Sequence, residues 1–178
     1  MAHASAAVLV GHGRATEDPA VTARLVTLVE QIGLSTLAEL WADRPARSLP
    51  GALWRLYALR EWVGRHPLEA SREYAAGMRF TAVAHVVAGM AEPPGPQEVR
   101  ELTDAIMTGV FQGDLAVALE RAAAFCHVVA AGRAELAGEA DALGGSASQR
   151  LTGRAAAMQT TALDLQACAS LWRRGELH

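Results

Sequence analysis

The chain has 178 residues, of which 51% are hydrophobic and 20% charged, so it carries enough apolar material for one domain with a substantial core. All 16 basic residues are Arg, and against 19 acidic residues they leave a net charge of −3 at pH 7, which argues against binding to nucleic acid or anionic lipid through charge alone. Two Cys are too few for a disulfide-stapled secreted domain, and 38 Ala favour helix, because Ala loses no side-chain rotamer entropy there.

The first residues give no export or membrane signal. The apolar run from Ala6 to Val10 is too short for a signal peptide and lacks a basic start, and no uninterrupted apolar run reaches the roughly 20 residues that cross a bilayer. We therefore expect a soluble, cytoplasmic protein without a membrane span. Residues 1–18 are an N-terminal segment that need not be ordered.

Two helices are predicted before residue 45. From Val21 onward apolar residues recur at spacings of 3 and 4, which predicts a helix over about 19–32 that ends at Gly33. Ser35 is expected to cap a short second helix, and the Arg44-Pro45 pair is expected to end it, because the residue before proline avoids helical geometry.

The next two helices contain most of the aromatic residues. Pro50 opens a third predicted helix over 51–64, and its apolar residues form two stripes: Leu53, Leu56, Leu59 and Val63 on one, and Trp54, Tyr57, Ala58 and Trp62 on the other. A fourth helix is predicted from Pro67 to about residue 88, before the Pro-rich run at 92–96. Its expected core stripe is Leu68, Ala75, Met78, Ala82 and Val86.

The last third has the strongest pattern. After a fifth helix that begins near Val99 and ends at Gly113, residues 115–136 and 151–172 each keep a 4-3 apolar spacing. Joined by the Gly144-Gly145-Ser146 turn, they predict an antiparallel hairpin. The fold class is therefore all-α, a single helical bundle of six or seven helices over 19–178 that ends in this hairpin, with subdomains 19–92 and 97–178 as an alternative.

The string from Val8 to Gly13 resembles the start of small tetrapyrrole cobalt chelatases over residues 7–30, which implies a role for His12 in metal insertion. That fold also needs further parallel strands, and the pattern after Gly33 provides none. His85 and the Cys126-His127 pair are the other metal candidates. Adjacent helical residues point about 100° apart, however, so Cys126 and His127 do not serve one site easily, and we expect no metal or cofactor.

A DNA-binding alternative lies in the second and third helices. They could form a helix-turn-helix that directs Arg55 and Arg60 at DNA, but the turn between them is longer than usual for that motif and holds two prolines. Nucleic acid is therefore a disfavoured partner.

Aromatic and long side chains of the third and fourth helices supply the candidate site. Trp, Tyr and Arg are the residues enriched at binding hot spots. The candidate interaction or ligand-binding residues are Trp54, Tyr57, Arg60, Trp62, Tyr74, Met78 and His85. The alternative is that these aromatics pin the core of an Ala-rich bundle.

Residues 48–57, SLPGALWRLY, and 113–122, GDLAVALERA, resemble an uncharacterised family of short helical proteins from GC-rich bacteria, some of whose members are labelled RNA polymerase β subunit. The resemblance spans most of 34–137, implies no catalytic residue, and includes none of the motifs of that large subunit.

These patterns predict a non-catalytic interaction protein. We expect an adaptor or regulatory subunit that binds a protein partner or a second copy of itself, and that exposes an apolar or aromatic patch. The first alternative is a bundle that binds a small apolar ligand in a closed cavity lined by Trp54, Tyr57, Tyr74, Met78 and His85. A helical enzyme is the next alternative, and it would bring titratable side chains together in one cleft.

Overall fold

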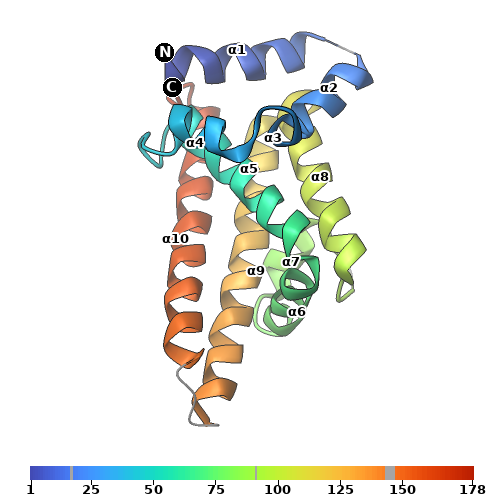
Figure 1. Cartoon of the computed structure of the whole chain (residues 1–178), viewed down its shortest axis with the longest axis vertical. Coiled ribbons are helices and arrows are strands. Elements are labelled where there is room, and N and C mark those ends of the chain that lie inside the picture. Colours follow the sequence, from blue (N-terminus) through green and yellow to red (C-terminus); the bar gives the residue numbers. More distant parts are fainter. Residues whose placement is uncertain (17, 91, 143–146) are drawn as a thin grey trace.

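The computed structural model describes residues 1–16, 18–90, 92–142 and 147–178, without the side chains of residues 82 and 85, and its regular structure in these ranges is entirely helical (Figure 1). The helices are α1 (Ala2–Ala15), α2 (Pro19–Val26), α3 (Leu28–Ile32), α4 (Leu34–Trp41), α5 (Leu49–Arg65), α6 (Pro67–Met78), α7 (Ala82–Ala88), α8 (Pro96–Gln112), α9 (Leu115–Ala142) and α10 (Ala147–Arg173). The predicted all-α bundle is confirmed, with ten helices in the described ranges where the sequence patterns separate six or seven.

The additional helices have local causes. Residues 2–15, which sequence reasoning left without an element, form α1 across one end of the bundle (Figure 1). The helix predicted over 19–32 is interrupted at Thr27, where φ is −94° and ψ is 17° and the hydroxyl donates to the carbonyl of Ala23 at 2.9 Å. The helix predicted from Pro67 is interrupted after Met78, and the Thr81 hydroxyl donates to the Gly77 carbonyl at 2.8 Å.

The central helix of the bundle is α9, which contacts α6, α7, α8 and α10. Its length and hydropathy would suffice to cross a membrane, but 72% of its most apolar 18-residue window is buried inside the protein. A helix that is apolar on all sides is typical of the middle of a bundle, which is where α9 lies. The antiparallel hairpin of α9 and α10 is confirmed, while its turn at 144–146 lies outside the described residues (Figure 1).

Two glycines bring α6 and α9 into backbone contact. A Cβ atom built on Gly132 of α9 would lie 1.7 Å from the carbonyl oxygen of Glu73, and one built on Gly77 of α6 would lie 1.8 Å from that of Val128. Ordinary contacts of a Cβ atom are 3.4–4 Å. The crossing of these two helices therefore depends on the absence of both side chains.

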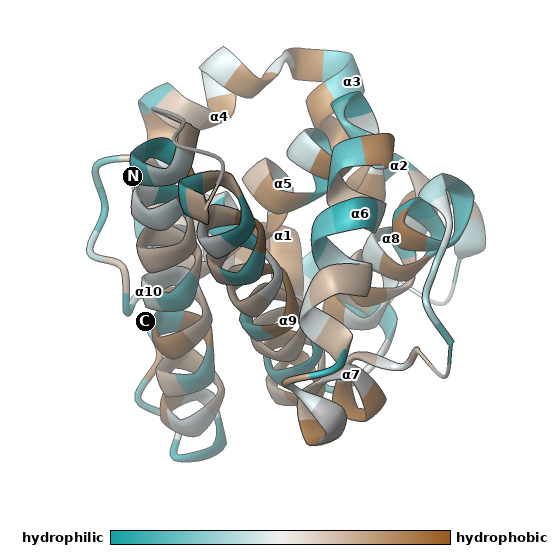
Figure 2. Ribbon diagram, turned by 90° about the horizontal axis from the view of Figure 1, so that it is seen from below, coloured by the Kyte–Doolittle hydropathy of each residue, from teal (hydrophilic) through white to brown (hydrophobic). Residues whose placement is uncertain are grey.

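The core stripe predicted for residues 67–88 is wrong. Leu68 is 75% exposed and Val86 65% exposed, whereas α6 buries Ala70, Tyr74 and Gly77 against its neighbours. Leu68 lies in the first turn of α6, which buries a different face, and the interruption after Met78 changes the direction of the turns that contain Val86. Hydrophobic residues of α7 consequently lie at the edge of the molecule, as Figure 2 shows.

Candidate functional site

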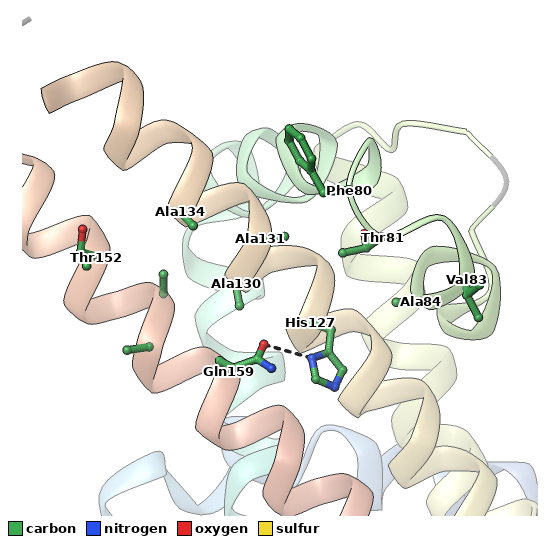
Figure 3. A pocket seen from close by; sticks show the side chains of 12 residues that line it. Phe80, Thr81, Val83, Ala84, His127, Ala130, Ala131, Ala134, Thr152 and Gln159 are labelled. Atoms are coloured by element: carbon green, nitrogen blue, oxygen red, sulfur yellow. Dashed lines mark hydrogen bonds between the residues drawn. The ribbon is translucent and has the colours of Figure 1, made fainter. Parts of the chain in front are cut away.

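A groove of about 830 Å³ lies between α9, α10 and the segment that leads into α7 (Figure 3). Most of its surface is small or apolar. The residues that line it are Phe80, Thr81, Val83, Ala84, His127, Ala130, Ala131, Ala134, Thr152, Ala155, Ala156 and Gln159. These twelve include no Asp, Glu or Arg, so the groove offers an uncharged surface to whatever enters it.

One rim of the groove carries large apolar side chains that point into solvent. Phe80 is 59% exposed and Val83 is 78% exposed, and Val86 and Val87 continue this exposed surface along α7. We call the groove lining together with Phe80, Val83, Val86 and Val87 the apolar patch. It combines a hollow lined by alanine with a neighbouring protrusion of aromatic and branched side chains.

A single polar bridge links the two long helices within the groove. His127 of α9 and Gln159 of α10 approach with Nδ1 and Oε1 3.0 Å apart (Figure 3). Because the amide oxygen can only accept, the imidazole Nδ1–H donates in this bond. The bridge occupies one polar atom of each side chain and leaves the alanine surface beside it free for packing.

A second hollow lies between α5 and α10, and we call it the α5–α10 cavity. Its volume is about 430 Å³, and its walls are Trp54, Arg55, Ala58, Leu59, Trp62, Arg133, Arg154, Met158 and Thr161. Trp54, Ala58 and Trp62 recur every four residues along α5, so one stripe of that helix faces the cavity. The predicted aromatic stripe of this helix therefore lines a cavity through Trp54 and Trp62, both of which are half-buried.

A buried ion pair lies behind the cavity wall. Arg133 Nε donates to Glu73 Oε2 at 2.7 Å, and both side chains are more than nine-tenths buried. The guanidinium carbon of Arg133 lies 4.8 Å from the ring centre of Trp62, close enough for a cation–π contact. Burial raises the pKa of Glu73 above its ordinary value, while the charge and hydrogen bond of Arg133 act in the opposite direction.

The two candidate tyrosines belong to the core. The Tyr57 hydroxyl donates to the carbonyl of Leu25 at 2.6 Å, and burial raises its pKa. Tyr74 packs on Phe125 with ring centres 5.2 Å apart, and burial raises its pKa to about 12. Its hydroxyl is buried without a hydrogen-bond partner among the described residues.

The remaining candidate residues also lie apart from one another. Arg60 makes ion pairs with Asp104 at 2.6 Å and Glu30 at 3.2 Å on another part of the surface. Met78 is half-buried against the core, and the side chain of His85 lies outside the described part of the chain. Of the side chains expected to share a closed pocket, Trp54 lines the α5–α10 cavity, whereas Tyr57 and Tyr74 are buried in the core and Met78 packs against it.

The catalytic and nucleic-acid alternatives gain no geometric support. His12 lies exposed within α1, so the segment that resembles the opening of a chelatase is helix where that fold needs a strand and loop. Cys126 is fully buried, which raises the pKa of its thiol to about 12. Arg55, which a helix-turn-helix would direct at DNA, donates to the carbonyl of Gly51 and faces Asp164. In the described ranges, no three His, Cys, Asp or Glu side chains gather as a metal site.

Sequence reasoning missed the groove and the cavity arginines. Arg133 did carry a signal, because it occupies a position of the 4-3 stripe of α9 where every neighbouring member is apolar, and such a position requires a buried partner. The groove had no comparable signal. Its alanines come from two helices that are joined only in three dimensions.

Comparisons of the chain with protein-family models, with curated proteins and with solved structures return no match. The family resemblances drawn from the sequence stay predictions.

Proposed function

We propose that this chain is a non-catalytic helical interaction protein, an adaptor or regulatory subunit, that binds through the apolar patch and takes a second copy of itself as its first partner. The observation that carries the proposal is the open alanine-lined groove with Phe80 and Val83 on its rim. Contiguous exposed apolar surface on a folded protein is typical of an interaction site.

The chemistry of the groove supports an apolar helix as the occupant. Small side chains on α9 and α10 allow the backbone of another helix to approach closely, and rows four residues apart, such as Ala130 with Ala134 and Thr152 with Ala156, form the ridges between which a helix packs. Because the lining holds no charged residue, a charged helix face would lose its hydration there without gaining a partner. The matching surface is an apolar helix face.

The protein itself presents such a face beside the groove. Residues Val83, Val86 and Val87 of α7 are exposed together, next to a hollow of the size and polarity that would accept them. In a two-fold symmetric dimer the same patch occurs on both subunits, so a protrusion of one can fill the hollow of the other. This self-complementarity favours a second copy over an unrelated helix.

The test is the oligomeric state of matched variants, measured by sedimentation equilibrium over a range of concentrations. The wild-type chain is expected at twice its 18.8 kDa monomer mass at high concentration. Val83→Arg places a charge in the patch and should produce the monomer at all concentrations, while circular dichroism reports an unchanged fold. Leu163→Arg is the control, since Leu163 is an exposed apolar residue of α10 outside the patch.

The results separate a second copy from another partner. A wild-type chain that stays monomeric overturns self-association. Val83→p-benzoylphenylalanine then tests the patch in cells, because this side chain crosslinks to a protein in contact with it. Reproducible crosslinking to one other polypeptide, lost when Ala131→Glu is added, supports the adaptor role, and the absence of any crosslink overturns the patch as a binding surface.

A further inference from the structure

We infer that the α5–α10 cavity binds a small organic anion with a flat apolar body, of the class of aromatic carboxylates. This site is separate from the apolar patch, and it does not depend on the proposed interaction function. Three features support it: the apolar walls of the cavity, the unpartnered indole N–H of Trp62, and the three arginines among the wall residues.

The apolar walls fit a flat body. Trp54 and Trp62 line the cavity from α5, and Met158 lines it from α10. Tryptophan rings stack on other flat rings, and a methionine thioether packs favourably against an aromatic edge. The volume of about 430 Å³ lies within the range of small-molecule sites.

One buried donor of a wall residue has no acceptor among the described residues. The indole Nε1–H of Trp62 is buried and makes no hydrogen bond with any described residue. Arg133 uses Nε for Glu73 and Nη1 for the carbonyl of Arg154. A buried donor without an acceptor is unfavourable, so the Trp62 indole would gain from an oxygen acceptor brought within its reach.

The charges that line the cavity are positive. Three wall residues are arginines, and none is acidic. Each arginine pairs with a carboxylate that is not part of the walls: Arg55 with Asp164, Arg133 with Glu73, and Arg154 with Glu69 and, at 3.8 Å, Glu73. The walls therefore present guanidinium groups and no carboxylate to an occupant. Arginine also matches a carboxylate geometrically, because its planar fork can donate two parallel hydrogen bonds.

The test compares two probes of the same shape by isothermal titration calorimetry. The probes are 2-naphthoate and the uncharged 2-naphthalenemethanol. We expect one 2-naphthoate per chain, bound at least tenfold more tightly than the alcohol. In NMR spectra of the ¹⁵N-labelled protein, the indole N–H signals of Trp54 and Trp62 should shift. The signal of Trp41 should not, because its Nε1–H already donates to Ser5 Oγ at 3.1 Å in another part of the core.

A cavity-filling variant locates the site without disturbing the buried ion pair. Ala58→Phe places a ring in the cavity and should weaken 2-naphthoate binding at least tenfold. Its control is Ala157→Phe, at an exposed position of α10 that lines neither hollow and should bind like the wild type. Circular dichroism and a urea unfolding curve show whether each variant is folded.

Three results would overturn the inference. Equal affinity for the alcohol and the carboxylate would show that the cavity does not recognise a negative charge. Undiminished binding to a folded Ala58→Phe variant, or shifts confined to His127 and its neighbours in the groove, would place the ligand elsewhere. No binding of either probe would show that the cavity is not a site for this class, and it would leave the oligomeric test of the apolar patch unaffected.

Discussion

The close contact between α6 and α9 predicts that adding a single methyl group to Gly132 lowers the free energy of unfolding strongly. In Gly132→Ala the new methyl group would lie 1.7 Å from the backbone oxygen of Glu73, so one helix must move by well over an ångström. Overpacking of this kind costs about 1–3 kcal/mol, and the atoms in the way are backbone atoms that cannot rotate aside. Disturbing the adjacent Glu73–Arg133 pair adds to the loss, whereas replacing Gly in a helix recovers up to about 1 kcal/mol. We expect a net loss of about 2–4 kcal/mol in the free energy of unfolding.

Gly138→Ala is the control for this substitution. Gly138 lies in the same helix, six residues away, and a Cβ atom there would meet nothing within 4 Å. It should gain up to about 1 kcal/mol from helix propensity alone. Urea unfolding followed by circular dichroism and Trp fluorescence compares both variants with the wild type. If Gly132→Ala proves as stable as Gly138→Ala, the close crossing of α6 and α9 is wrong.

Two further predictions follow from buried polar side chains. Tyr57→Phe should lower the free energy of unfolding by about 1–2 kcal/mol, because the carbonyl of Leu25 loses its donor. Tyr74→Phe removes a hydroxyl that has no partner among the described residues, so it should be neutral or stabilising. Equal losses for the two variants in urea unfolding would contradict this contrast. Burial raises the thiol pKa values of Cys126 to about 12 and of Cys168 to about 11 from an ordinary value of 9.0. The thiols therefore lose their protons at lower pH in the unfolded chain than in the folded protein. The free energy of unfolding should fall as the pH rises from about 9 toward 11, and the thiols should not change it below about pH 9. Equal free energies of unfolding at about pH 8 and about pH 10.5 would refute the burial of both thiols.

The parts of the fold that the sequence predicts are those that depend on local spacing. The 4-3 stripe of α9 is buried as expected, from Leu115 through Val129, because a long uninterrupted helix keeps its phase. The stripe predicted from Pro67 to residue 88 does not keep its phase, because the chain leaves helical geometry after Met78. Val86 was consequently expected in the core and lies on the surface.

The candidate site was predictable only in part. The aromatic stripe of α5 could be read from spacing, and Trp54 and Trp62 do line a cavity. Its arginines could not be assigned to that cavity, because Arg133 and Arg154 come from helices whose packing against α5 depends on the whole bundle. Tyr57 and Tyr74 share the residue type of a recognition site, and only the three-dimensional structure shows that both are core residues.

The two long helices separate the two hollows. On α10, Ala155, Ala156 and Gln159 line the groove, whereas Arg154 and Met158 line the α5–α10 cavity, so one helix contributes uncharged residues to the first hollow and an arginine to the second. The same division holds on α9, where alanines line the groove and Arg133 reaches the cavity. Because one pair of helices forms a wall of both hollows, occupation of either would restrict the movement of α10 against α9, and binding of 2-naphthoate should then change the dissociation constant of the proposed dimer. Sedimentation equilibrium with and without the probe measures that coupling, and identical dissociation constants would show that the two hollows act independently.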